Sequence, residues 1–266
     1  MFSAASFFTL DSFAHRDIFP ADAPVWEGLK QLKTYVADMV TTLPRHGVFK
    51  DATPLPATLI LHNDEIRPAD NCSIRFADTT KGQLKVVENG RELRGASVLM
   101  AGAVLMGDQI SIGQGSLVES GALIKGPTII GHQTEVRQGA YLRGNCLVGD
   151  RCVVGHTTEV KHSILLNDAK AGHFAYLGDS ILGTAANLGA GTKFANLRFL
   201  SGTIRVRTPD GPVDTGLRKF GAILGDGAQT GCNSVTNPGT LMGREAVLMP
   251  NTTAKNGFHP AGTVIR

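Results

Sequence analysis

Charged and aromatic residues are scarce in this 266-residue sequence. Asp, Glu, Lys and Arg make up 18% of it, and Phe, Trp and Tyr make up 6%, whereas about 25% of the residues in an average globular domain are charged. The 26 basic and 23 acidic residues leave a net charge of only +3. We therefore expect no nucleic-acid partner, because nucleic-acid-binding domains concentrate basic charge far more strongly. Low charge together with 32 glycines argues against a helical bundle and favours short strands joined by tight turns.

Cysteine is also rare, and its spacing excludes the common cysteine sites. The four cysteines stand at 72, 146, 152 and 232 without a C-x-x-C pair, so neither a zinc site nor a redox pair is indicated. No apolar run approaches the roughly 18 residues of a membrane-spanning helix, and the stretch MFSAASFFTLDSFAHRD lacks the basic and cleavage regions of a signal peptide. We expect a cytoplasmic protein with no membrane partner and no metal.

A period of six residues runs through the middle of the sequence. Read in hexads from residue 100, the sequence places Ile, Leu, Val or Met first each time: Met100, Met106, Ile112, Val118, Ile124, Ile130, Val136, Leu142, Val148 and Val154. This period fits neither a helix face nor simple strand alternation, and it indicates short flat strands separated by turns. The pattern resembles the left-handed parallel β-helix families, in which three hexads form one triangular coil.

We therefore expect a mainly β protein with a capping segment over 1–70, helical or irregular, and a left-handed β-helix over 71–266. Residues 24–42 carry a stripe of apolar side chains after a proline, which predicts an amphipathic helix that covers the open end of the β-helix. Residues 197–218 break the repeat. Apolar and polar residues alternate in TIRVRT, and the PDG that follows favours a turn, so this segment is predicted to be a protruding hairpin.

Stacking of successive coils predicts a cluster of cations at one corner. Arg143 and Lys161 hold the same position on side A, 18 residues apart, so they lie about 4.8 Å apart in adjacent coils. Tyr176 ends side C where side A begins. Because stacked cations repel unless an anion lies between them, the pair indicates a phosphate or carboxylate ligand; two solvated surface cations are the alternative. Arg137 has the same hexad position, but we assign it to side B and exclude it.

A second column lies on side C of successive coils, and its members are His156, His173, Ala190, Cys232 and Pro250. Small side chains beside a histidine would allow an extended ligand to lie against the wall. His173 is the candidate base of this column, although a single histidine is more often structural.

The segment KAGHFAYLGDSILGTAANLGAGT, residues 170–192, closely resembles the acetyltransferase domain of the bifunctional N-acetylglucosamine-1-phosphate uridyltransferase/glucosamine-1-phosphate acetyltransferase. The likeness includes YLRGN, EVKHS, FAN and KFGAILGDGAQTG. In that family the histidine of this block is the general base, which implies this role for His173. The resemblance implies sugar-phosphate contacts at Arg143, Lys161, Tyr176, Asn187 and Lys219, and acetyl-CoA contacts at Ala190, Asn196, Cys232 and Pro250.

The resemblance implies a homotrimeric acetyltransferase of nucleotide-sugar biosynthesis that uses acetyl-CoA and acts on a phosphorylated amino sugar such as glucosamine-1-phosphate. No L-x-x-G-x-G-T loop occurs in the sequence, so we expect no nucleotidyltransferase activity. The 197–218 insertion and Cys232 depart from the family pattern and leave the acceptor open. A non-catalytic sugar-phosphate-binding or scaffold protein of the same fold is the alternative. A zinc-dependent carbonic anhydrase is disfavoured, because the spacing of His156, His162 and His173 lacks the H-x4-H pair that it needs.

Overall fold

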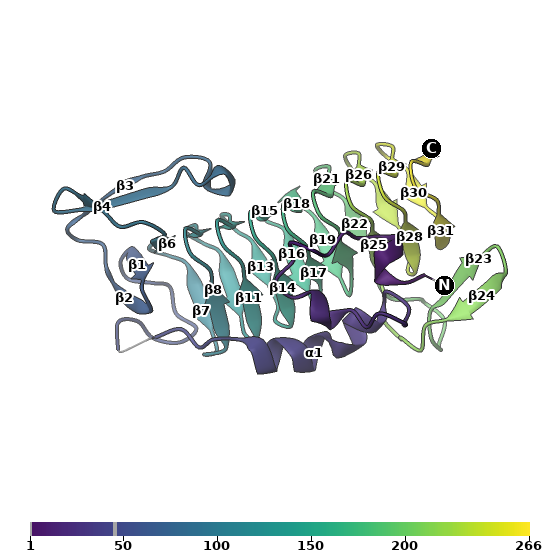
Figure 1. Ribbon diagram of the computed structural model, residues 1–266, viewed down its shortest axis with the longest axis horizontal. Coiled ribbons are helices and arrows are strands. Elements are labelled where there is room, and N and C mark those ends of the chain that lie inside the picture. The colour runs from purple at the N-terminus through teal and green to yellow at the C-terminus, as the bar shows by residue number, and fades with distance from the viewer. Residues whose placement is uncertain (1, 45–46) are drawn as a thin grey trace.

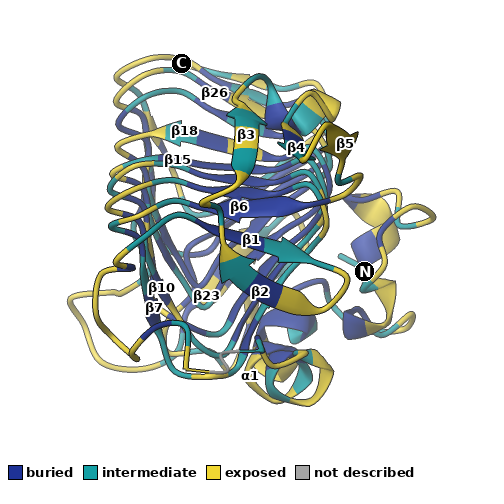
Figure 2. Ribbon diagram, turned by 90° about the vertical axis from the view of Figure 1, so that its left-hand side faces the viewer, coloured by how far each residue is buried: buried dark blue, intermediate teal, exposed yellow. Residues whose placement is uncertain are grey.

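Three β-sheets form the sides of a triangular prism (Figures 1 and 2), in a computed structural model that describes residues 2–44 and 47–266. Face A is an eight-stranded sheet of β7 (Val104–Met106), β10 (Leu123–Lys125), β13 (Tyr141–Leu142), β16 (Glu159–Lys161), β19 (Tyr176–Gly178), β22 (Lys193–Phe194), β27 (Val235–Thr236) and β30 (Thr253–Ala254).

Face B is a second eight-stranded sheet of β8 (Ile110–Ile112), β11 (Thr128–Ile130), β14 (Cys146–Val148), β17 (Ile164–Leu165), β20 (Ile181–Leu182), β25 (Ala222–Leu224), β28 (Thr240–Met242) and β31 (Gly257–His259).

Face C is an eleven-stranded sheet of β1 (Leu59–His62), β2 (Glu65–Pro68), β6 (Ser97–Leu99), β9 (Leu117–Val118), β12 (Glu135–Val136), β15 (Val153–His156), β18 (Lys170–His173), β21 (Asn187–Leu188), β26 (Gln229–Thr230), β29 (Val247–Leu248) and β32 (Val264–Ile265). The chain visits the three faces in turn, and on face C each strand from β6 to β29 pairs in parallel with the strand one coil later. The expected parallel β-helix is confirmed.

The hexad leaders fill the inside of the prism. From Val118 to Val154, every residue that leads a hexad is buried, and these side chains belong to one continuous hydrophobic core. Corners between faces need unusual backbone angles; Gly144, between faces A and B, has φ of +87°, a conformation that glycine adopts without steric cost.

The N-terminal segment packs on the side of the prism. It consists of η1 (Ala4–Ser6), η2 (Arg16–Ile18) and α1 (Glu27–Met39). Leu32 and Val36 of α1 are buried in a cluster with the outward side chains of Leu147 and Ile164 on face B, and α1 runs along the lower edge of the molecule in Figure 1. The helix is therefore confirmed, but the expectation that it covers the open end is wrong.

Leu43 and residues 47–92 close the N-terminal end and cover part of face C. Leu43, Phe49 and Leu55 join the core inside the first coils. The antiparallel strands β3 (Cys72–Arg75), β4 (Lys85–Glu88) and β5 (Arg91–Glu92), with η3 (Thr79–Lys81), form a separate small sheet that stands above β6 in Figure 2. The parallel ladders thus begin at β6, later than the boundary that we placed at residue 71.

The expected hairpin is confirmed within 197–218. It consists of β23 (Arg205–Thr208) and β24 (Gly211–Asp214). The hairpin lies beside the C-terminal coils, at the end of the prism away from β1 and β2 (Figure 1). Ile204 and Val206 are buried in the same cluster as α1, so one side of the hairpin packs against the prism. Within residues 2–44 and 47–266, no helix has both the length and the apolar character needed to cross a membrane.

Candidate functional site

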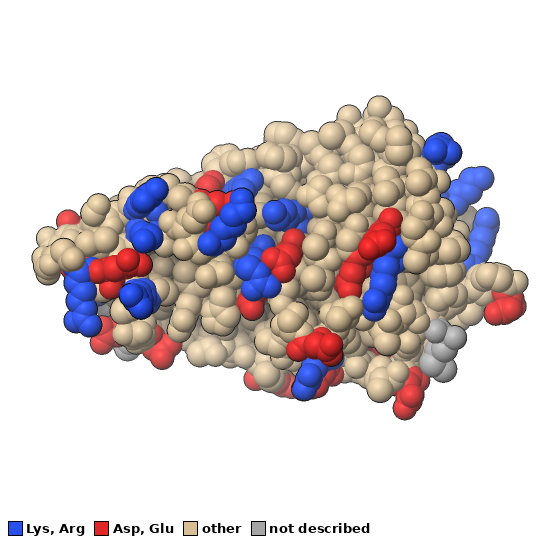
Figure 3. All heavy atoms as spheres, turned by 45° about the horizontal axis from the view of Figure 1, so that its top comes forward, with Lys and Arg blue, Asp and Glu red and all other residues tan. Residues whose placement is uncertain are grey.

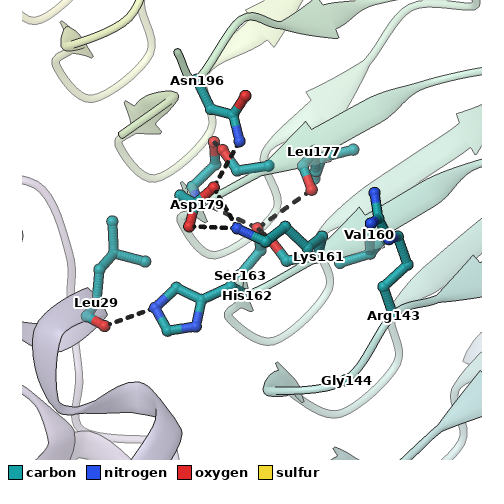
Figure 4. A network of polar contacts seen from close by, with 12 residues as sticks. Leu29, Arg143, Gly144, Val160, Lys161, His162, Ser163, Leu177, Asp179 and Asn196 are labelled. Carbon is teal, nitrogen blue, oxygen red and sulfur yellow. Dashed lines mark hydrogen bonds and ion pairs between the residues drawn. The ribbon is translucent and has the colours of Figure 1, made fainter. Parts of the chain in front are cut away.

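The two cations predicted to stack lie in adjacent coils at the corner between faces A and B (Figure 4). The Arg143 backbone N–H donates to the carbonyl oxygen of Val160, which fixes this register. Nη1 of Arg143 donates to Oε1 of Glu159 at 2.7 Å. Nζ of Lys161 donates to both carboxylate oxygens of Asp179 at 2.8 Å. Each cation therefore has its own carboxylate, so an external anion is not required to relieve their repulsion.

Asp179 is the centre of this corner network. Its side chain is 7% exposed, and Nδ2 of Asn196 donates to its Oδ2 at 2.5 Å. Tyr176 lies nearby, and burial, followed by the negative charges of Glu159 and Asp179, raises the pKa of its phenol. Tyr176 therefore remains protonated at neutral pH.

Lys219 and Asn196 extend this corner into the next coil. Leu197 and Lys219 form a bridge where the 197–218 insertion leaves and rejoins the coil, and the Phe220 N–H donates to the carbonyl oxygen of Asn196. The structure thus groups Asn196, an expected acetyl-CoA contact, with the expected sugar-phosphate contacts. These residues, on face A and at its corner with face B, are Arg143, Lys161, Tyr176, Asn196 and Lys219.

The second predicted column lies on face C as the coil arithmetic placed it. Each member of the column accepts a hydrogen bond on its carbonyl oxygen from the next coil. The donors to His156, His173, Ala190 and Cys232 are the backbone N–H groups of Phe174, Gly191, Asn233 and Asn251, respectively. The rings of His156 and His173 stack with centroids 5.7 Å apart. His173 is exposed, and the neighbouring Phe174 is 61% exposed. The imidazole of His173 is therefore exposed to solvent and stacks on one side against the ring of His156.

Glycines form the floor beside this column. Gly155, Gly172, Gly189 and Gly231 occupy the preceding position in four successive coils, as the pairing of β15 with β18 and the later ladders places them. A β-carbon on Gly155 would lie 1.8 Å from the carbonyl oxygen of Gly172, and one on Gly189 would lie 2.5 Å from the carbonyl carbon of Gly231. Gly172 differs, because a β-carbon there would meet no atom within 4 Å.

Gly172 and Gly189 of this column form the floor of a groove of about 690 Å³ on face C. Asn187 stands on one wall, and His173, Ala190 and Cys232 stand on the other. The groove thus brings together four of the predicted site residues. Pro250 lies one coil beyond Cys232, since the Asn251 N–H donates to the Cys232 carbonyl oxygen. Figure 3 shows a broad area without charged side chains toward the C-terminal end of the molecule.

Arg137 is the residue that the sequence reasoning missed. We excluded it as a residue of side B, but β12 belongs to the same sheet as β15 and β18, and Arg137 lines the groove together with Lys170. The correct face was available from the sequence, because Val136 and Val154 lead hexads exactly one coil of 18 residues apart. The roof of the groove, made by Ala77, Asp78 and Thr80, had no signal in the hexads.

The histidines do not converge on one point. His156 and His173 are neighbours, but Nε2 of His162 lies 2.9 Å from the carbonyl oxygen of Leu29, and burial lowers the pKa of His162. Among the residues that the structure describes, no group of three or more His, Cys, Asp or Glu side chains could hold a metal ion. Burial raises the pKa of the thiols of Cys146 and Cys152 to about 12, whereas Cys232 is exposed in the groove.

Curated relatives match about a third of the chain. It is 36% identical over 88 residues to a "Bifunctional sugar-1-phosphate nucleotidylyltransferase/acetyltransferase" of Sulfurisphaera tokodaii, which is 33% of this chain and 22% of the relative. It is 38% identical over 94 residues to "Bifunctional protein GlmU" of Methanococcus maripaludis, 35% of this chain and 23% of that protein. These matches confirm the resemblance. The chain spans less than a quarter of the length of these relatives.

Solved structures give weaker likenesses. The acetyltransferase domain of PglB from Neisseria gonorrhoeae, in complex with acetyl coenzyme A, is 14% identical with a TM-score of 0.26, over 64% of this chain and 57% of that chain. A putative acetyltransferase from Desulfovibrio desulfuricans is 13% identical with a TM-score of 0.33, over 75% and 61% of the two chains. These scores support no functional inference.

A family model, described as the GMPPB C-terminal domain, matches residues 124–256. This match includes the coils that carry His173, the glycine floor and the Lys161–Asp179 corner. It covers half of the chain, and the protein therefore belongs to the GMPPB C-terminal domain family.

Proposed function

We propose that this protein is an acyltransferase that transfers the acetyl group of acetyl-CoA to the amine of a phosphorylated amino sugar such as glucosamine-1-phosphate. The observation that carries the proposal is the exposed imidazole of His173 beside a glycine-floored groove. Two relatives whose names include acetyltransferase or GlmU support it.

His173 is the proposed general base. An amine attacks a thioester carbonyl only as the free base, and an imidazole with a pKa of about 6.5 in model peptides accepts a proton near neutral pH. The amine nitrogen forms the new C–N bond, the C–S bond breaks, and the amine proton passes to His173 and then to the departing thiolate. The stacked ring of His156 limits the rotation of the His173 side chain.

The C-terminal part of face C is the proposed wall for acetyl-CoA. Ala190, Cys232 and Pro250 follow His173 in one column. Backbone atoms alone lie nearest to Gly189, whereas the Pro250 ring packs beside Gly231. A long uncharged chain can lie close to such a surface and use backbone groups as hydrogen-bond partners. Three coil spacings, about 14 Å, separate His173 from Pro250.

The acceptor is proposed to lie between His173 and Asn187, which line the same groove in adjacent coils. Arg143, Lys161, Tyr176 and Lys219 lie beyond the next corner, on face A or at its far edge. In a homotrimer, which we also propose, the corner of one copy would approach the groove of its neighbour and bring Asn196 with it. For this corner to bind the acceptor, the phosphate would have to join the existing ion pairs of Arg143 with Glu159 and of Lys161 with Asp179.

The experiment is a His173→Ala substitution, assayed by release of the CoA thiol from acetyl-CoA with glucosamine-1-phosphate. We expect kcat to fall by about 10²–10⁴, the usual effect of losing a general base, with little change in Tm because the side chain is exposed. His162→Ala is the matched control: it removes a partly buried contact with α1 and should lower Tm while kcat is retained.

Turnover by His173→Ala within a few-fold of the unsubstituted protein would contradict the assignment of the base. If the unsubstituted protein binds the sugar phosphate but releases no CoA thiol, the protein is a non-catalytic sugar-phosphate-binding protein.

A further inference from the structure

Arg137 is fixed at the end of the groove by a buried carboxylate. Nε and Nη2 of Arg137 both donate to Oε2 of Glu135, at 2.8 and 2.6 Å. The other oxygen, Oε1, accepts the Thr79 N–H at 3.0 Å. The Glu135 side chain is 8% exposed and that of Arg137 is 29% exposed. Because both carboxylate oxygens are occupied, the guanidinium is held in one orientation, and its Nη1 group takes no part in these contacts.

The charges around this end of the groove leave one cation in excess. Arg137 is balanced by Glu135. On the roof, Lys81 lies 3.0 Å from Asp78, and hydrogen bonds from Thr80 and Lys81 lower the pKa of Asp78 to about 2. Lys170 is exposed in the same row as Glu135, two coils further on. Within residues 2–44 and 47–266 no carboxylate lies at ion-pair distance from Lys170. The local charge is therefore +1, which favours an anion.

The position of His173 divides the groove into two unequal parts. Toward the C-terminus, the wall is uncharged over three coils. Toward Arg137, only two coil spacings, about 10 Å, remain before the guanidinium closes the groove. This shorter part, enclosed by the η3 roof, has the length of one sugar ring with an anionic substituent rather than that of a long extended chain.

We propose that Arg137 and Lys170 form a subsite for the phosphate of the acceptor. The fixed guanidinium presents N–H donors, and Lys170, on the same strand as His173, supplies the unpaired charge. A phosphate held there orients the amine toward His173. This inference rests on the proposed function for the identity of the acceptor, and it places the phosphate in the groove instead of at the Arg143–Lys161 corner.

The first test is a Lys170→Met substitution, with Lys255→Met, an exposed lysine on the outside of the last coils, as the matched control. Binding of glucosamine-1-phosphate and of inorganic phosphate is measured by isothermal titration calorimetry, and KM is measured for both substrates. We expect Lys170→Met to weaken sugar-phosphate binding by roughly ten- to a hundredfold, the effect of losing a charge-assisted hydrogen bond, with the KM for acetyl-CoA unchanged and Lys255→Met without effect.

A second variant, Gly172→Ala, tests the groove without removing a charge. The added methyl group meets no protein atom within 4 Å and projects into the groove, so Tm should be unchanged while binding of glucosamine-1-phosphate is lost.

Three results would overturn the subsite: unchanged sugar-phosphate binding in both variants, a Lys170→Met effect confined to the KM of acetyl-CoA, which would place a CoA phosphate there, or no binding of either probe to the unsubstituted protein. Binding that depends on Lys170 without any CoA release would leave the subsite intact and remove only the acyltransferase proposal.

Discussion

The Lys161–Asp179 ion pair is more deeply buried than the neighbouring Arg143–Glu159 ion pair. Asp179 is 7% exposed on its side chain, and Lys161 is 25% exposed, whereas Glu159 and Arg143 are 35% and 45% exposed. Removing one partner of a buried pair leaves a desolvated charge, and exposed pairs contribute little. The two neighbouring pairs should therefore respond differently to truncation of their cations.

We predict that Lys161→Ala lowers the free energy of unfolding by about 1–3 kcal/mol, because the Asp179 carboxylate keeps only its Asn196 hydrogen bond. Arg143→Ala should cost at most about 1 kcal/mol. Urea unfolding of both variants measures the difference. Equal losses in the two variants would show that the buried carboxylate has no special weight.

The columns of face C were predictable from residue numbers, because the hexads and the shortened five-residue sides give the length of each coil, and a parallel ladder then fixes which residues stack. His156, His173 and Ala190 follow this rule. The carboxylate partners at the other corner were not predictable in the same way. Asp179 lies one residue beyond its strand, where the chain turns, and Arg143 reaches back along its strand to Glu159. Side-chain direction at a corner depends on local dihedral angles that the hexad period does not contain.

At the scale of elements, the sequence predicted helix α1 but not its location. An apolar stripe shows that a helix packs against something, and it does not show which surface receives it. The receiving surface had its own signal: Leu147, Ile164 and Ile181 are apolar at outward positions of face B, where a solvent-exposed sheet would carry polar side chains. The strands β3 to β5 had no hexad signal, because they form antiparallel pairs outside the coils.

Two partly buried histidines join the N-terminal segment to the coils. His15 lies 3.1 Å from the Tyr35 hydroxyl, and His162 contacts the Leu29 carbonyl oxygen. Burial lowers the pKa of both imidazoles, although Asp150 opposes the shift for His15 and Asp179 opposes it for His162. In the unfolded chain a histidine titrates near a pKa of about 6.5. Below that pH the unfolded or detached state binds more protons than the docked state.

We predict that the docked segment is fully stable above about pH 7 and loses stability as the pH falls through about 6.5. The loss is at most about 1.4 kcal/mol per pH unit for each histidine. Trp26, the single tryptophan, is 2% exposed and lies 6.3 Å from the Phe220 ring, so its fluorescence reports undocking during urea titrations at pH 7 and pH 5.5. The double variant His15→Asn/His162→Asn should lose this pH dependence; a dependence of the same size in that variant would assign it to other groups.

At the scale of the whole molecule, the three faces are covered unequally. The N-terminal segment and the 197–218 insertion pack on face B, and the β3–β5 sheet covers part of face C through the contact of Thr79 with Glu135. Face A carries none of these elements. Large apolar side chains are exposed where the chain enters or leaves face A, before β19 and after β22. They are Phe174 at 61%, Leu197 at 47%, Phe199 at 109% and Leu200 at 72%.

We predict that these side chains are buried between copies of the chain in a homotrimer. Phe174 follows His173 directly, so a neighbour seated against it would enclose the groove and exclude water from the thioester. A stable interface buries about 1,200–2,000 Å², and exposed aromatic side chains supply much of the binding energy of such contacts.

Light scattering at micromolar concentration should give about 84 kDa, three times the chain mass of 28.1 kDa. The double variant Phe199→Ser/Leu200→Ser should shift the mass toward 28.1 kDa and lower kcat, with an unchanged circular dichroism spectrum. The control is Met39→Ser, at the end of α1 and 53% exposed, which should change neither the mass nor kcat. A monomeric mass for the unsubstituted protein would contradict the trimer, and the residues of the Arg143–Lys161 corner would then have no route to the groove of His173.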